Sequence, residues 1–242
     1  MTSEEEQEFV EELYSDCEEQ LKTVKEENKA EKEELMQTIA MILLLYTIKN
    51  DKLDLNRVEK ATIWSQVTKL FKENLTQSMA REKKIITSTL EDTCRRTAKF
   101  YGWNINFKDV HEIVDSLYLG ENYRTRITNN NKELYIRLNK EIKDFIDGKT
   151  SVNKIKDNLV KLYDYKDYQA KRLIENELSR VQRETYLSQM AFLGEKFVKR
   201  NAVLDSKTCD KCAELDGKIY TIEEARDFVP HVNCRCYFTI LE

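Results

Sequence analysis

Residues that break helices are nearly absent from this chain. Its 242 residues include five glycines and a single proline, Pro230. Because glycine and proline end helices and shape the turns between strands, so few of them favour long helices over many short strands. Charged residues make up 35% of the chain, which fits helices with broad solvated faces. We therefore expect a mainly α protein with an elongated helical body.

The N-terminal segment, residues 1–34, differs in charge from the rest of the chain. It carries 14 acidic and 4 basic side chains, whereas the remainder carries 30 acidic and 36 basic ones. We expect an acidic N-terminal helix whose sparse apolar points, Phe9, Leu13, Leu21 and Val24, make it a docking segment for another chain. The slightly basic remainder tolerates a polyanion but forms no basic stripe, so charge alone does not establish nucleic-acid binding.

Residues 35–200 are expected to form the α-helical body. The most apolar stretch, Leu35–Ile48, should anchor the core, and its apolar run is about half the length that a membrane helix needs. Apolar residues recur at helical spacing from Arg57 to Tyr101 and again in the second half of the body. A long helix is expected from about Tyr168 to Lys199. Breaks are predicted at Asn50-Asp51, Gly102, Gly120, Asp147-Gly148 and Asp164–Asp167.

Residues 201–242 change character and predict a small α+β module. Short strands are expected at Lys218–Tyr220 and Tyr237–Ile240, and Asp216-Gly217 is typical of a hairpin turn. Thr221 should cap a short helix, because Glu224 stands at the position that completes a capping box.

Cysteines and a histidine crowd this module. Cys209 and Cys212 form a Cys-x-x-Cys pair, and His231, Cys234 and Cys236 follow. Zn²⁺ prefers four nitrogen or sulfur ligands in a tetrahedron, and about forty residues bury too little apolar surface to fold unaided. We predict a structural Zn²⁺ site, with Cys209 and Cys212 as its firmest ligands.

The sequence leaves open which four of these five residues bind the metal. If residues 234–236 form a strand, Cys234 and Cys236 point to opposite faces, and one of them joins His231. If the segment is a second knuckle, both cysteines can bind. A dithiol redox pair, a disulfide and a catalytic zinc are the alternatives. The acidic N-terminus is unlike a secretory signal, so we expect reduced thiols and favour metal ligands over disulfides.

Motifs of enzymes are not found. A glycine-rich phosphate loop, a His-Glu-x-x-His zinc motif and a Gly-x-Ser-x-Gly nucleophile elbow are all missing from the sequence. We therefore predict no catalytic residue, no cofactor-binding residue, no small-molecule substrate and no enzyme activity.

The tail contains two motifs: the run from Leu204 to Lys218, with its Thr-Cys-Asp-Lys-Cys and Leu-Asp-Gly, and Pro230-His-Val-Asn-Cys-Arg-Cys236. With them the tail resembles the phage head morphogenesis family, the minor capsid or minor head proteins related to Mu protein F. Softer similarities extend the resemblance to about residues 118–242. They lie at Gly120, Arg126-Ile127, the Asp147–Ser151 turn and Ile174–Glu177.

This resemblance implies a virion component in the capsid interior or at the portal vertex. Its partners would be the portal protein, the major capsid protein or both, with no membrane, and it would aid head morphogenesis or genome delivery. During assembly the protein would be located in the host cytoplasm. A DNA-binding module packaged with the genome is the alternative, motivated by the slightly basic body and Arg235, and a metal-dependent nuclease is a further one.

Overall fold

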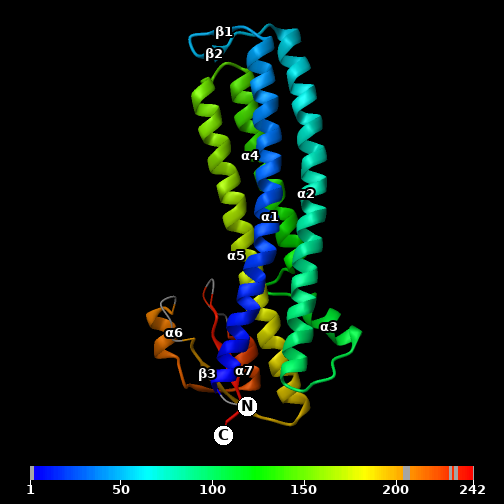
Figure 1. The fold of residues 1–242 in the computed structure, drawn as a ribbon, viewed down its shortest axis with the longest axis vertical. Coiled ribbons are helices and arrows are strands. Elements are labelled where there is room, and N and C mark those ends of the chain that lie inside the picture. The colour runs from blue at the N-terminus through cyan, green and yellow to red at the C-terminus, as the bar shows by residue number, and fades with distance from the viewer. Residues whose placement is uncertain (1–2, 204–207, 229–230, 232–233, 242) are drawn as a thin grey trace. The chain divides into compact units, whose positions relative to one another are not determined.

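The computed structural model describes residues 3–203, 208–228, 231 and 234–241. The predicted signature residues 204–207, 230 and 232–233 lie outside this part of the chain. The elements are α1 (Ser3–Leu45), β1 (Ile48–Lys49), β2 (Lys52–Leu53), α2 (Arg57–Phe100), α3 (Phe107–Val114), α4 (Tyr123–Ile146), α5 (Val152–Phe192), β3 (Phe197–Asn201), α6 (Asp210–Glu214), β4 (Ile219–Thr221), α7 (Ile222–Asp227) and β5 (Tyr237–Thr239). The prediction of a mainly helical protein with a small C-terminal strand module is confirmed (Figure 1).

The chain forms two compact units, and the longest helices contribute to both. We call them the module unit (Met1–Gln20, Ile85–Tyr123 and Arg172–Glu242) and the bundle unit (Leu21–Lys84 and Arg124–Lys171). Helix α1 runs through residue 34 without a break, and strand β3 begins at Phe197. The three separate domains expected at 1–34, 35–200 and 201–242 stay a prediction.

In the bundle unit, segments of α1, α2, α4 and α5 run side by side (Figure 1). Their buried aliphatic and aromatic side chains form one core, to which Leu35, Ile63, Ile142, Phe145 and Leu159 contribute from all four helices. The predicted break at Asn50-Asp51 is confirmed as the turn of the β1–β2 hairpin, and both residues have a positive φ. Among the described residues, no helix is both long and apolar enough to cross a membrane.

The turn between α4 and α5 requires a glycine. Gly148 has a φ of +72°, and a Cβ atom at this position would lie 2.9 Å from the carbonyl oxygen of Leu53. A side chain here would meet a fixed backbone atom, so the turn packs directly on strand β2. The predicted break at Asp147-Gly148 is confirmed at this position.

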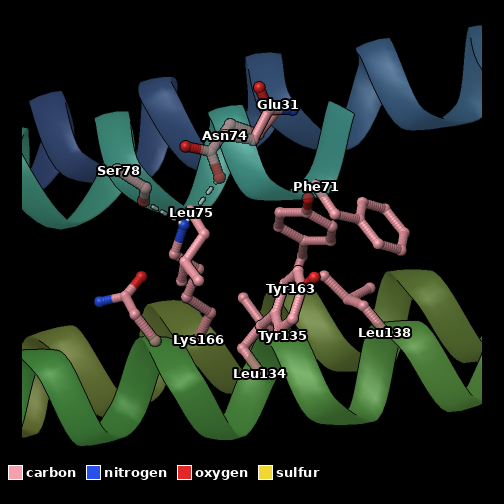
Figure 2. A pocket seen from close by; sticks show the side chains of 11 residues that line it. Glu31, Phe71, Asn74, Leu75, Ser78, Leu134, Tyr135, Leu138, Tyr163 and Lys166 are labelled. Atoms are coloured by element: carbon pink, nitrogen blue, oxygen red, sulfur yellow. Dashed lines mark hydrogen bonds and ion pairs between the residues drawn. The ribbon is translucent and has the colours of Figure 1, made fainter. Parts of the chain in front are cut away.

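A buried polar layer crosses the bundle core (Figure 2). Lys166 of α5 donates to Glu31 of α1 at 2.8 Å and to Ser78 of α2 at 2.6 Å. Arg81 approaches the other oxygen of Glu31 at 3.0 Å. The Lys166 and Glu31 side chains are 7% and 8% exposed, so each charge depends on the other for compensation.

Glu82 extends this layer toward α4, where the Asn131 amide donates to it at 2.7 Å. Burial raises the pKa of Glu82, and the Asn131 hydrogen bond and the charge of Lys166 oppose this rise. The folded protein therefore holds the Glu82 proton more tightly than the unfolded chain does. The stability that this group contributes is complete below its unfolded pKa and is lost as pH rises through the folded pKa.

Replacing Glu82 with glutamine is expected to raise the free energy of unfolding at pH 7. The neutral amide removes the cost of a buried charge and can still accept from Asn131. The gain should shrink as pH falls toward 4, because the native glutamate is then protonated too. Urea unfolding of both proteins at pH 4 and pH 7 measures this difference. Equal gains at both pH values would show that the charge of Glu82 is not the cause.

Three local predictions of the sequence are wrong. No turn interrupts α5 at Asp164–Asp167, since Tyr163 and Lys166 face the core there and continue the helical packing. Helix α5 ends at Phe192 rather than Lys199. A hydrogen-bonded turn through Gly194 connects its end to strand β3. Asp216-Gly217 is no two-residue hairpin, because it follows helix α6 and joins it to β4.

In the module unit, a three-stranded antiparallel sheet in the order β4-β3-β5 packs against the end of α5. Tyr186, Leu187 and Met190 of α5 meet Val198, Ile222 and Phe238 in one apolar cluster. The capping box is confirmed, because Thr221 accepts from the amide of Glu224 and the Glu224 carboxylate accepts from the amide of Thr221. This packing gives the cysteine-rich segments a fixed base.

The N-terminal part of α1 also belongs to this unit. Its apolar residues Phe9, Val10 and Leu13 are buried, and the Phe9 ring stacks on Phe100 with centroids 4.1 Å apart. Phe9 and Leu13, two points of the apolar stripe predicted for docking, are therefore already covered within the unit. The glutamates at positions 4, 5 and 8 remain exposed.

Candidate metal centre

The first cysteine pair lies at the start of helix α6. Cys209 is the N-cap residue, and its carbonyl accepts from the amides of Cys212 at 2.9 Å and Ala213 at 3.1 Å. This single tight turn brings the side chains of Cys209 and Cys212 to the same side of the backbone. Both can therefore face one ion, as the Cys-x-x-Cys spacing predicts.

The second segment meets this pair through His231 and Cys234. The Nε2 atom of His231 lies 3.3 Å from the Cys209 sulfur and 2.8 Å from the Cys212 sulfur. The sulfurs of Cys212 and Cys234 are 3.7 Å apart. Strand β5 begins only at Tyr237, and the amide of Cys234 bonds to the carbonyl of His231. Residues 234–236 therefore lie outside any strand, in agreement with the knuckle alternative rather than the strand alternative.

All five candidate residues converge on Cys212. The ligand atoms of Cys209, Cys212 and His231 lie within 4.8 Å of one another, and so do those of Cys212, Cys234 and Cys236. A cavity of about 10 Å³, room for a single small occupant, lies among them. The structure thus brings together the whole predicted set. That these residues bind a metal stays a prediction.

The spacing of the donors can be compared with that around a tetrahedral ion. Zinc–sulfur bonds of about 2.3 Å and zinc–nitrogen bonds of about 2.0–2.1 Å place two sulfurs about 3.8 Å apart and a sulfur and a nitrogen about 3.6 Å apart. The Cys212–Cys234 distance of 3.7 Å agrees with the sulfur–sulfur spacing. His231 lies closer to the sulfurs than an ion would hold it, at 3.3 Å from Cys209 and 2.8 Å from Cys212.

Arg200 is a participant that the sequence analysis missed. Its side chain is among the largest that are fully buried, at 1% exposed, and it lies two residues after Val198 on the inward face of β3. The guanidinium donates to the sulfur and the carbonyl oxygen of Cys212, both at 3.2 Å, and it lies 3.8 Å from the Cys234 sulfur. Because the sequence predicted a helix through Lys199, the period-two pattern of a strand, which places Arg200 on the same face as Val198, was not recognised.

The Arg200 charge suits an anionic metal site. Three thiolates, one neutral imidazole and Zn²⁺ sum to one negative charge, and four thiolates would sum to two. A buried cation at hydrogen-bond distance lowers the cost of burying that charge. Burial lowers the pKa of Arg200, but the charges of the neighbouring cysteines outweigh it and raise the pKa overall. The ring of Phe228 covers the guanidinium at 5.0 Å.

The pKa values of the Cys234 and Cys236 thiols are shifted in opposite directions. Hydrogen bonding from Cys236 lowers the pKa of Cys234 to about 5, although burial of Cys234 opposes this change. The same hydrogen bond, together with burial, raises the pKa of Cys236. The lowered pKa favours the thiolate form of Cys234, which is the form of cysteine that binds metals.

Tyr14 ties helix α1 to this centre. Its hydroxyl donates to the carbonyl oxygen of Cys234 at 2.8 Å. Burial raises the pKa of Tyr14, so the phenol keeps the proton that it donates. The backbone at Cys234 is thus held by the first helix of the chain.

Asp216 and the two remaining cysteines, Cys17 and Cys94, make contacts of other kinds. Asp216 accepts from the amide of Ala202 at 2.7 Å. All six cysteines are free thiols, and Cys17 and Cys94 are buried in the helices. Cys94 accepts from the Thr185 hydroxyl, which fits a packing role.

The softer similarity at Ile174–Glu177 also has a structural counterpart. Glu177 is buried in α5 and accepts from Arg180 at 2.6 Å. Arg180 in turn donates to the carbonyls of Ile113 and Val114 and to the Ser116 hydroxyl, at the end of α3. This pair satisfies carbonyl groups that a helix end leaves without partners.

Residues 136–239 match the family model described as Phage Mu protein F like protein. The match spans the second half of α4, all of α5 and the module with its five candidate ligands. Gly120 and Arg126-Ile127 lie outside the matched residues. No curated protein and no solved structure matches the chain. The match indicates a structural protein related to phage heads and capsids. Residues 136–239 are thus similar to the Phage Mu protein F like family, the family that the cysteine-rich tail predicted.

Proposed function

We propose that this protein is a minor capsid protein of a phage virion. In this role it associates with the portal protein or the inner face of the capsid and aids head morphogenesis or genome delivery. Its C-terminal module holds a structural Zn²⁺ ion. The observation that carries the proposal is the convergence of five nitrogen and sulfur donors from two separate segments inside the family-matched residues.

The surroundings of the donors favour a structural ion over a catalytic one. Cys212 and Cys234 are each 3% exposed, and five donors compete for four positions. A catalytic zinc keeps one position open for water or substrate, whereas structural sites are closed by protein ligands. The ion would supply folding free energy to a segment with a small apolar core.

Different residues would bind the ion, balance the negative charge of its ligands and fix the backbone of the site. Cys209, Cys212, His231 and Cys234 would bind the ion, with Cys236 as the alternative sulfur. Arg200 balances their negative charge, and Tyr14 fixes the backbone of Cys234 to α1. The module would thereby stay attached to the end of α5 and present a fixed surface to the portal or capsid.

Incorporation into virions tests this proposal. The double variant Cys209→Ser/Cys212→Ser is expected to be lost from assembled particles, because two of the ligands are removed and the module unfolds. Immunoblots of purified particles, normalised to the major capsid protein, measure the loss. Cys94→Ser, which changes a buried thiol that is not a candidate metal ligand, should be incorporated normally. If the double variant is incorporated like the native protein, the module is not needed in the head and the proposal fails.

A further inference from the structure

Helix α4 gathers lysines on one side of the bundle unit. The residues of α4 that are exposed to solvent are Thr125, Asn129, Lys132, Ile136, Arg137, Lys140 and Lys143. None of these exposed residues of α4 is acidic. At 3.6 residues per turn, Lys132, Lys140 and Lys143 fall within an arc of about 80° and span about 16 Å along the helix. We call these three residues the α4 lysine stripe. The sequence shows no basic run here because acidic residues alternate with the cations.

The acidic residues of α4 do not neutralise the α4 lysine stripe. They are half-buried, and two of them are paired with other cations. Glu133 accepts from Arg137, and Asp144 accepts from Lys149 at 3.4 Å. The three lysines of the stripe form no ion pair with another residue that the structure describes. Their positive charges are therefore available to a partner.

The exposed side of α4 adjoins that of α5. The Arg137 guanidinium lies 5.2 Å from the centre of the Tyr165 ring. The Asn158 amide of α5 donates to the Glu141 carboxylate of α4 at 2.5 Å. The two helices thus present one continuous surface beside the α4 lysine stripe.

Helix α5 contributes charges of both signs to this surface. Lys154 and Lys161 are exposed and lie about one turn before and after Asn158. Asp157 and Asp164 are also exposed on α5 and offset the charge of these two lysines. The net positive charge of the joined surface therefore comes from α4.

The composition of this surface fits a phosphate backbone better than a protein partner. The cores of protein interfaces are rich in aromatic side chains and poor in lysine. Among the exposed residues of α4, Ile136 is the large apolar one. Lysine carries a point charge on a flexible stem and commonly contacts phosphate oxygens. A DNA duplex presents one phosphate charge per about 1.7 Å of its axis, so a stripe of about 16 Å faces several of them.

We propose that the α4 lysine stripe binds the phosphate backbone of double-stranded DNA. Its contacts are ionic and read no base sequence, so the affinity depends on salt rather than on the sequence of the duplex. The stripe lies in the bundle unit and shares no residue with the candidate metal centre. This inference goes beyond the proposed role in the capsid, and either one can fail while the other stands.

Titration of a labelled duplex with the full-length protein, followed by fluorescence anisotropy, tests the proposal. At about 50 mM salt the protein should bind a duplex of about 20 base pairs. The logarithm of the affinity should fall with the logarithm of the salt concentration with a slope of about −3, because each neutralised phosphate contributes about −0.9. A second duplex of unrelated sequence should bind within about twofold of the first.

Lysine-to-glutamine variants locate the site. Replacing all three lysines of the α4 lysine stripe should weaken binding at least tenfold and bring the salt slope close to zero. The matched control Lys69→Gln/Lys72→Gln/Lys84→Gln removes the same charge from exposed positions of α2 and should change the affinity less than threefold. Glutamine has a helix propensity close to that of lysine, so both variants should fold.

Competition with polyglutamate separates DNA from an acidic protein as the partner. At equal total charge, polyglutamate should displace the duplex at least fivefold less effectively, because charges along an extended polypeptide are spaced about twice as widely as those of a duplex. Equal displacement would assign this surface to an acidic polypeptide and overturn the proposal. No binding at low salt, an affinity that salt does not change, or equal losses in the variant and its control would also overturn it.

Discussion

Replacing Cys212 with serine is expected to unfold the C-terminal module while the bundle unit stays folded. Cys212 is the residue on which both groups of ligand atoms converge, and Arg200 also bonds to it. Structural zinc contributes roughly 10–16 kcal/mol of apparent binding free energy in small zinc domains, and that free energy stabilises the fold directly. The small sheet and its apolar cluster cannot replace a contribution of this size.

Hydrogen exchange measured by mass spectrometry resolves this expectation by segment. In the Cys212→Ser variant, amides of β3 and β5 should lose their protection, and amides of α2 in the bundle unit should keep it. Cys94→Ser serves as the control, because it makes the same chemical change at a buried cysteine that is not a candidate metal ligand. Unchanged protection of β3 and β5 in the Cys212 variant would show that the module folds without its sulfur cluster.

Replacing Lys166 with methionine is expected to destabilise the protein by about 3–5 kcal/mol. The variant leaves the Glu31 carboxylate buried with one of its two cationic partners removed, and it also takes away the donor to Ser78. Removing one member of a buried ion pair costs far more than the pair itself contributes, because the remaining charge stays out of water. Chemical unfolding at neutral pH measures the loss.

Two comparisons separate this charge effect from a loss of packing. Lys161→Met alters an exposed lysine of the same helix and should change stability by less than about 0.5 kcal/mol. The double variant Glu31→Leu/Lys166→Met removes both charges and should be more stable than Lys166→Met alone. If the double variant loses more stability than the single one, the buried charge of Glu31 is not what makes Lys166 necessary.

Local rules predicted the parts of the fold that depend on neighbours in sequence. The long helical runs follow from the scarcity of glycine and proline, and the capping box follows from the spacing of Thr221 and Glu224. The convergence of Cys209, Cys212, His231 and the two later cysteines could be expected because one small metal site needs that set of donors.

Tertiary contacts decided the features that the sequence analysis missed. Asp164–Asp167 has the composition of a turn. The segment stays helical, and Lys166 donates to Glu31 of α1, which is 135 residues away in sequence. From sequence alone, the charge of Arg200 argues against a buried position in a strand. In the structure the sulfurs of Cys212 and Cys234 accept from its guanidinium, which accounts for its burial. The β4-β3-β5 order likewise depends on pairings across the whole module, which no local pattern reveals.

The metal content of the purified full-length protein tests the central claim most directly. Mass spectrometry under native conditions, without chelators during purification, is predicted to show one zinc ion bound to each folded chain. The same measurement on the Cys212→Ser variant should show the metal-free mass. A native chain that is folded, carries the metal-free mass and takes up no added zinc would contradict the account.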